Sequence, residues 1–309
     1  MELLDLSQLL LMSATLLVAF ATVGYLAVVL SARQMRTRAH AESKELVGAG
    51  GPPMDAAVSE THGAAEPGGV RASKPSGVAW YASIAAILSL VLLTASLVTR
   101  AMVTGHAPFA SHYEFSVAFA WGILVAHVVV ERRYQVRVLA MMTLPLALAM
   151  LLYASTMSYE PSPLVPALQN SPLLTLHVFT ACIGYGAAAV GFGAAVMYLI
   201  APKIRWRGWP KSDLLDEIGY GSVVVTFPML TFMLILGSIW ANVAWGRYWS
   251  WDPKETAALV TWLIYGGYLH ARVTRDWRGS RSAWLLVLGF AAVIFTYFGN
   301  LFFGGLHSY

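Results

Sequence analysis

The chain has 309 residues, of which 58% are hydrophobic and 12% charged, and its mean hydropathy is +0.62. Soluble globular domains usually carry about 25% charged residues, so this composition excludes a soluble fold and predicts an all-α, polytopic integral membrane protein. The formal net charge is +4, but the basic residues form short clusters between apolar segments, which is typical of membrane topology and not of nucleic-acid binding.

Apolar runs of about 17–25 residues are long enough to cross a bilayer as helices. No basic residue precedes the first such run, and Arg33, Arg36 and Arg38 follow it. A cleaved signal peptide has the opposite flank, so we expect a retained helix with its N-terminus outside. The sequence predicts eight transmembrane helices, at residues 8–31, 79–99, 114–131, 136–155, 173–201, 217–239, 254–271 and 282–303.

The basic residues give this arrangement an orientation. If the loops alternate from an external N-terminus, all but three of the 20 Lys and Arg residues fall on the cytoplasmic side. The exceptions are Arg100, Arg247 and Lys254. Both termini are then expected outside, in a bacterial plasma (inner) membrane or an equivalent thylakoid-type membrane.

Composition also divides the chain. Residues 1–31 form the expected N-terminal transmembrane helix, and residues 32–78 are rich in Gly, Ala, Pro, Ser and Glu, which predicts a disordered cytoplasmic linker. Residues 79–309 form the expected membrane domain. The single cysteine, Cys182, excludes an intrachain disulfide or CxxC pair, so any thiol chemistry must use the cysteines of a partner.

The most unusual stretch is WANVAWGRYWSWDPKE at residues 240–255, on the expected outer side. Interfacial tryptophans are common, so an aromatic belt is one interpretation. The density of rings, with Gly246 allowing a bend, favours a broad surface on which a flat apolar ligand can lie. Its tryptophans are Trp240, Trp245, Trp249 and Trp251.

The end of this stretch has the pattern of a helix start. Asp252 is expected to cap free backbone N–H groups, Pro253 suits a first helical turn, and Glu255 stands where a capping box closes. A structural role for Asp252 is therefore as well supported as a direct contact with a ligand.

Histidines at membrane level are candidate ligands. His177 and His307 are expected at the outer level of the tryptophans, where two imidazoles would make an axial pair for haem iron. His270 is expected toward the cytoplasmic side, and a second ligand there must come from elsewhere, with His127 as an alternative. His106 and His112 lie in an outer loop, where we expect them to be mainly solvated.

Residues 240–256 resemble the tryptophan-rich "WWD" signature of haem-handling membrane proteins. The DPKET ending is most similar to the CcsA (ResC) family of the System II cytochrome c synthase. The resemblance implies that SPLLTLHV and FFGGLHSY supply external haem ligands as His177 and His307, and that His270 ligates a haem within the membrane. The second ligand of that inner haem would come from a CcsB (ResB) partner.

The resemblance implies a role in cytochrome c biogenesis. The chain would carry haem b outward as substrate and present it for thioether attachment to the CxxCH motif of apocytochrome c. As a haem lyase (holocytochrome c synthase) subunit, it would act with a CcsB-like subunit and external thiol-reducing proteins. Positioning the haem would do most of the catalysis.

Three alternatives remain open at this point. The first is a System I type haem carrier that delivers haem to a chaperone. The second is a haem- or quinone-linked electron-transfer subunit. A solute transporter is disfavoured by the expectation that no acidic residue lies deep in the helices.

Overall fold

In the computed structural model every regular element is helical within the part of the chain that the structure describes. That part comprises residues 2–48, 77–161, 163–164, 168–169, 172–204, 206, 208–299 and 302–305, without the side chains of 32–48. The helices are α1 (Leu3–Gly48), α2 (Val78–Thr104), α3 (His112–Tyr134), α4 (Ala140–Ser155), α5 (Pro172–Ile200), α6 (Ser212–Trp245), α7 (Pro253–Arg275) and α8 (Ser280–Phe298), with short 3₁₀ turns η1 (Arg137–Leu139) and η3 (Ala201–Lys203).

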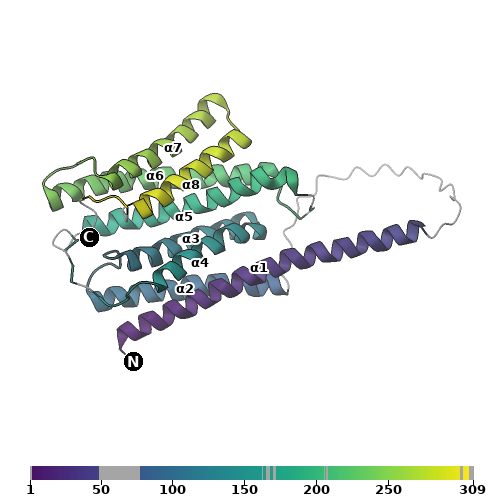
Figure 1. Ribbon diagram of the computed structural model, residues 1–309, viewed down its shortest axis with the longest axis horizontal. Helices are drawn as coiled ribbons and strands as arrows, with labels where there is room; N and C mark the ends of the chain where they lie inside the picture. Colours follow the sequence, from purple (N-terminus) through teal and green to yellow (C-terminus); the bar gives the residue numbers. More distant parts are fainter. Residues whose placement is uncertain are drawn as a thin grey trace.

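The long helices form one bundle in which each helix runs antiparallel to the one before it (Figure 1). α5 lies in the middle and packs against α3 on one side and against α6 and α8 on the other. Because of the alternation, α3, α5 and α7 begin at the end of the bundle where α6 and α8 finish. We call this the tryptophan end, because it carries residues 240–251, and the opposite end, with Arg132, Arg133 and Arg272, the basic end.

Within the residues that the structure describes, seven helices are long and apolar enough to cross a membrane, which confirms an all-α polytopic membrane protein. The predicted eighth span, 254–271, forms α7 but is not among the seven. α7 is long enough to span, but it has charged residues at both ends and buries Thr261, Tyr265 and Tyr268 against its neighbours. α7 packs against α8 and α6, so the polar side chains on that side of the helix contact protein.

Helix α1 continues past its apolar part. The segment that can span a membrane is Leu3–Ser31, which includes the predicted span 8–31, and the helical backbone runs on to Gly48. Residues 32–48, the first part of the predicted linker, have a helical backbone. Residues 49–76, the rest of the predicted linker, lie outside the described residues.

Small residues allow α3 and α5 to approach until their backbones touch. A Cβ atom on Gly186 would overlap the carbonyl group of Gly122, and a Cβ on Gly122 would overlap the carbonyl oxygen of Cys182. Close approach of this kind is the usual basis of helix association in lipid. α5 thereby becomes a fixed axis from which the side chains of the tryptophan end are positioned.

Two acidic residues are buried in the bundle, one near each end of α3, so neither lies in the middle of a membrane-spanning helix. Glu114 is 2% exposed and accepts a hydrogen bond from Arg100 Nε at 2.8 Å. Its other oxygen accepts the backbone N–H of Ala110 at 2.7 Å. A buried carboxylate needs such partners, and here they fix the loop that leads into α3.

The second acidic residue, Glu131, ties together α1, α2 and α3. It accepts hydrogen bonds from Tyr25 Oη at 2.7 Å and Ser83 Oγ at 2.6 Å. His127 Nε2 lies 3.2 Å from the same carboxylate, off the line of a hydrogen bond, and His127 Nδ1 is 2.9 Å from Thr143 Oγ1 of α4. His127 is thus part of a polar cluster among the first four helices.

The backbone contact between α3 and α5 gives a stability test. Gly186→Ala should lower the free energy of unfolding by about 1–3 kcal/mol, because the new methyl group has no room. The matched change Gly267→Ala, at a helical glycine where an added Cβ would meet no atom of another element within 4 Å, should be neutral or slightly stabilising. Thermal unfolding of both variants in detergent measures the difference, and equal stability would refute the close contact.

Candidate ligand pocket at the tryptophan end

A pocket opens at the tryptophan end between α3, α5, α6, α7 and α8. The empty space in it, counted together with its open mouth, is about 1150 Å³. Most of the wall is aromatic or aliphatic, and a few polar side chains converge on it. The aromatic lining residues are Phe109, Phe115, Tyr185, Trp240, Tyr248, Trp249 and Tyr297, and the ionisable ones besides tyrosine are His112, His177, Lys254 and Glu255.

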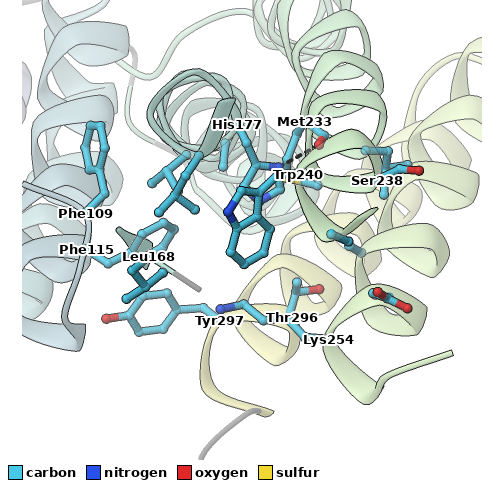
Figure 2. Close-up of a pocket in the computed structure, with 18 of the residues that line it drawn as sticks. Phe109, Phe115, Leu168, His177, Met233, Ser238, Trp240, Lys254, Thr296 and Tyr297 are labelled. Atoms are coloured by element: carbon cyan, nitrogen blue, oxygen red, sulfur yellow. Dashed lines mark hydrogen bonds between the residues drawn. The ribbon is translucent and has the colours of Figure 1, made fainter. Parts of the chain in front are cut away.

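His177, on the second turn of α5, is held in one orientation by α6. Its Nδ1 lies 2.7 Å from the carbonyl oxygen of Met233, shown by the dashed line in Figure 2. A carbonyl oxygen only accepts, so the proton is on Nδ1 and the lone pair is on Nε2. A hydrogen bond of this type to the far nitrogen is how proteins fix the tautomer of a metal-binding histidine.

Two further residues of α6 shape the space around this imidazole. A Cβ on Gly237 would lie 2.6 Å from both Cε1 and Nδ1 of His177, so only glycine leaves room for the ring. Trp240 is 2% exposed, and its ring is nearly parallel to the imidazole, at 17° and 6.4 Å between centroids. One face of α6 therefore forms all of these contacts with the imidazole, because Met233, Gly237 and Trp240 follow each other at helical spacing. We call this face the seat of His177.

The four tryptophans of the signature have different surroundings. Trp240 and Trp249 line the pocket. Trp245 packs its edge against Trp240, with centroids 4.8 Å apart. Trp251 is 70% exposed and touches Trp249 edge to face. The predicted aromatic surface is therefore a wall of two tryptophans, with one support and one ring on the outside.

Glu255 organises the loop that carries these rings. One oxygen of its carboxylate accepts hydrogen bonds from Ser250 N at 2.8 Å, Ser250 Oγ at 3.0 Å and Asp252 N at 3.2 Å. The bonds also stabilise Trp251, whose φ of 59° is rare for a residue with a side chain. At the other end of the loop, Gly246 ends α6 with φ 71°, which confirms the predicted bend.

Asp252 has the predicted structural role. It caps α7, its Oδ1 accepts Lys254 N at 2.9 Å, and Glu255 completes a capping box. Its Oδ2 lies against the backbone of Gly305, where a Cβ would overlap it. The start of α7 is thus packed against the chain that follows α8.

The structure brings one histidine to the pocket that the sequence did not predict there. His112 begins α3 and lines the same pocket as His177, with its ring edge-on to Tyr297. Its position depends on the Arg100–Glu114 pair, which pulls the preceding loop inward. No local sequence pattern shows that a residue of an outer loop will turn into the bundle. His106 lines a neighbouring hollow, with its Nδ1 2.8 Å from the carbonyl of Ala107.

The remaining predicted ligands are elsewhere. His270 is exposed near the end of α7, about 24 Å along the helix from Lys254. His127 belongs to the cluster of α1–α4, and α5 lies between that cluster and α7 in Figure 1. His307 lies outside the described residues.

These residues suit a flat, apolar ligand that carries a metal and some polar groups. The aromatic walls match the faces of such a ligand, and His177 offers a fixed lone pair. The indole N–H of Trp249 is buried without an acceptor within the described part of the chain. A buried donor of this kind is satisfied when a ligand supplies an acceptor.

The family profile named "Cytochrome C assembly protein" matches residues 109–307, which include the pocket. Curated relatives named "Cytochrome c biogenesis protein CcsA" are similar over nearly the whole domain. The protein of Guillardia theta is 36% identical over 252 residues, covering 72% of this chain and 83% of the relative. That of Prochlorococcus marinus (strain MIT 9301) is 35% identical, covering 72% and 82%, and that of Pyropia yezoensis 33%, covering 74% and 86%.

A solved structure, "Cytochrome c Heme Lyase CcmF", has the same fold, with a TM-score of 0.59 at 17% sequence identity. The match covers 96% of this chain, and the chain spans about half the length (47%) of that lyase. Fold and site together define a multi-pass membrane protein with an aromatic pocket at one end of its helical bundle. The chain belongs to the cytochrome c assembly protein family, with CcsA proteins as relatives, and has a role in cytochrome c maturation.

The role of Glu255 can be tested without any ligand. Glu255→Ala should remove the acceptor of three loop hydrogen bonds and cost about 1 kcal/mol in unfolding free energy through the lost capping box. Hydrogen exchange at the Ser250 and Asp252 amides should become faster. Glu160→Ala, at an exposed carboxylate of another loop, is the control and should leave both amides unchanged. Unaltered exchange in Glu255→Ala would show that the loop is held by other contacts.

Proposed function

We propose that the chain carries haem to the non-cytoplasmic side and presents it in this pocket for thioether attachment to apocytochrome c. The observation that carries the proposal is the seat of His177: Nδ1 is bound by the Met233 carbonyl and the lone pair of Nε2 belongs to an aromatic pocket. A neutral imidazole so fixed is a suitable axial ligand for haem iron.

The second axial ligand in this proposal is His307. The backbone of Gly305 lies against Asp252 at the start of α7, beside the pocket wall. Two residues of chain reach at most about 7 Å, and in the proposal this reach brings the His307 imidazole from Gly305 into the site. His112 lines the same pocket and is a further candidate to face the iron or the incoming peptide.

The chemistry asks for little more than orientation. Each cysteine thiol of the CxxCH segment adds across a haem vinyl group, so that sulfur bonds to one vinyl carbon and the hydrogen to the other, with no net oxidation. Trp240 and Trp249 would hold the macrocycle, and the substrate histidine would displace one axial ligand. Holding the reactants together in this way replaces much of what an acid or base would supply.

Delivery to the pocket would begin at the other end of the bundle. His270 is exposed on α7, so a second ligand for haem there must come from outside the described residues. A CcsB-like subunit packed on this face of α7 would supply it. Haem would then pass from the basic end, which we assign to the cytoplasm by its Arg and Lys residues, to the tryptophan end.

The ligand assignment predicts the absorption spectrum of the protein purified with a CcsB-like partner. His177→Ala and His307→Ala should each weaken the bis-imidazole spectrum of the external haem, and added imidazole should restore it. His106→Ala, at a histidine outside this pocket, should leave it unchanged. A partnered complex without haem, or a spectrum unaffected when both His177 and His307 are removed, would refute the proposal.

A second variant tests the seat and keeps the ligand. Gly237→Ala should push the imidazole away from the Met233 carbonyl, because the methyl group would lie 2.6 Å from the ring. We expect less bound haem and a lower yield of holocytochrome in cells, although His177 is intact. Gly221→Ala on the same helix, where a Cβ meets only Tyr134 Oη at 3.4 Å, is the matched control. Equal haem retention in both variants would show that the orientation of His177 is unimportant.

The main rival is a System I type haem carrier, which would share the pocket. The two functions differ in their product: a synthase subunit yields haem bound covalently to apocytochrome c, whereas a carrier passes haem to a chaperone. Reconstitution with apocytochrome c, reductant and a CcsB-like subunit, without a haem chaperone, should give a covalent haem product. If covalent product forms only when a chaperone is added, the carrier function holds.

A further inference from the structure

Lys254 is a cation in the wall of an otherwise aromatic pocket. It is the second residue of α7, is partly buried, and lines the pocket together with His177 and Trp240. Figure 2 shows its side chain extending from the start of α7 into the space between Trp240 and Tyr297. Lys254 takes part in none of the ion pairs among the described residues, so no carboxylate of that part of the chain lies within 4 Å of its ammonium group.

The carboxylates closest in sequence are already engaged. One carboxylate oxygen of Glu255 accepts three hydrogen bonds, from Ser250 N, Ser250 Oγ and Asp252 N, in the loop between α6 and α7, which we call the tryptophan loop. Asp252 caps the helix through Oδ1 and packs its Oδ2 against Gly305. Both groups therefore hold the backbone around Lys254, and the Asp252 carboxylate acts on its ammonium group as a nearby charge without forming an ion pair.

An ammonium group in an aromatic pocket loses hydration, and an anion that approaches it offsets this loss. Lysines at helix ends often reach out to water instead. Lys254 instead lines the same pocket as His177, the candidate iron ligand. The buried indole N–H of Trp249, in the same wall, adds a second donor without a partner within the described residues.

We propose that Lys254 binds a carboxylate of the ligand in this pocket. With His177 as the metal ligand, the ligand is then a metal-bearing macrocycle that carries free acid groups. The inference rests on the proposed function, in which the ligand is haem, whose two propionates lie along one edge. His177 fixes the axis through the iron, and that axis alone leaves the ring free to rotate. A cation at one edge selects one rotation and so determines which edge faces the incoming cysteines.

Arg247 is the other cation of the tryptophan loop, and the structure separates the two. Arg247 is exposed and does not line the pocket, whereas Lys254 is partly buried and does. A pair in the pocket is screened much less by salt than a pair at the surface. Arg247→Met is therefore a matched control that removes the same charge from the same segment.

The test compares haem with haem dimethyl ester, in which both propionates are blocked. Each is titrated into the detergent-purified, haem-depleted complex with the CcsB-like partner, and binding is followed by the axial-imidazole spectrum. Wild type should bind haem more tightly than the ester. Lys254→Met should weaken haem binding about tenfold or more and leave ester binding unchanged, because charged hydrogen bonds of this kind contribute roughly that factor.

Lys254→Arg should restore the preference for haem, and Arg247→Met should behave as wild type. Unchanged ester binding also shows that Lys254→Met is folded. If Lys254→Met weakens both ligands equally, or neither, the carboxylate contact is refuted while the pocket stands. If wild type binds neither ligand with an imidazole spectrum, the proposed function itself fails.

Discussion

The arrangement of the tryptophan end depends on how closely α5 and α6 approach each other at His177. The imidazole fits against α6 only because residue 237 has no side chain, and it is oriented there by the carbonyl of Met233. Behind it, α5 is held against α3 by contact between the backbones of Gly186 and Gly122. A side chain at any of these glycines would move the histidine relative to the aromatic wall. The pocket is thus a consequence of helix packing more than of loop conformation.

The same end of the bundle shows how charged groups can serve structure and function side by side. The loops around the pocket are fixed by carboxylates that accept hydrogen bonds from backbone N–H groups and from Arg100. These carboxylates belong to Glu114, Glu255 and Asp252. Lys254 has no such partner among the described residues and extends into the pocket. Groups that hold the site rigid are saturated, and the groups that face a ligand are left with capacity to bind one.

Much of the fold follows from the sequence, because span length, capping and turns are local properties. The apolar runs, the Asp252–Pro253–Glu255 helix start and the Gly246 bend were all predictable, and α7 is the one predicted span that falls short in apolarity. The site was predictable only in part. His177 and the tryptophans stand out by residue type, but the inward turn of His112 and the burial of Glu131 arise from contacts between distant helices. No periodicity along one helix reports those contacts.

The most direct test of the central claim is a cryo-electron microscopy structure of the haem-loaded complex with its CcsB-like partner. The account predicts iron at coordinating distance from His177 Nε2, with Nδ1 still bound to the Met233 carbonyl and the macrocycle between Trp240 and Trp249. Haem bound away from this pocket, or iron on Nδ1 with the Met233 bond broken, would contradict it.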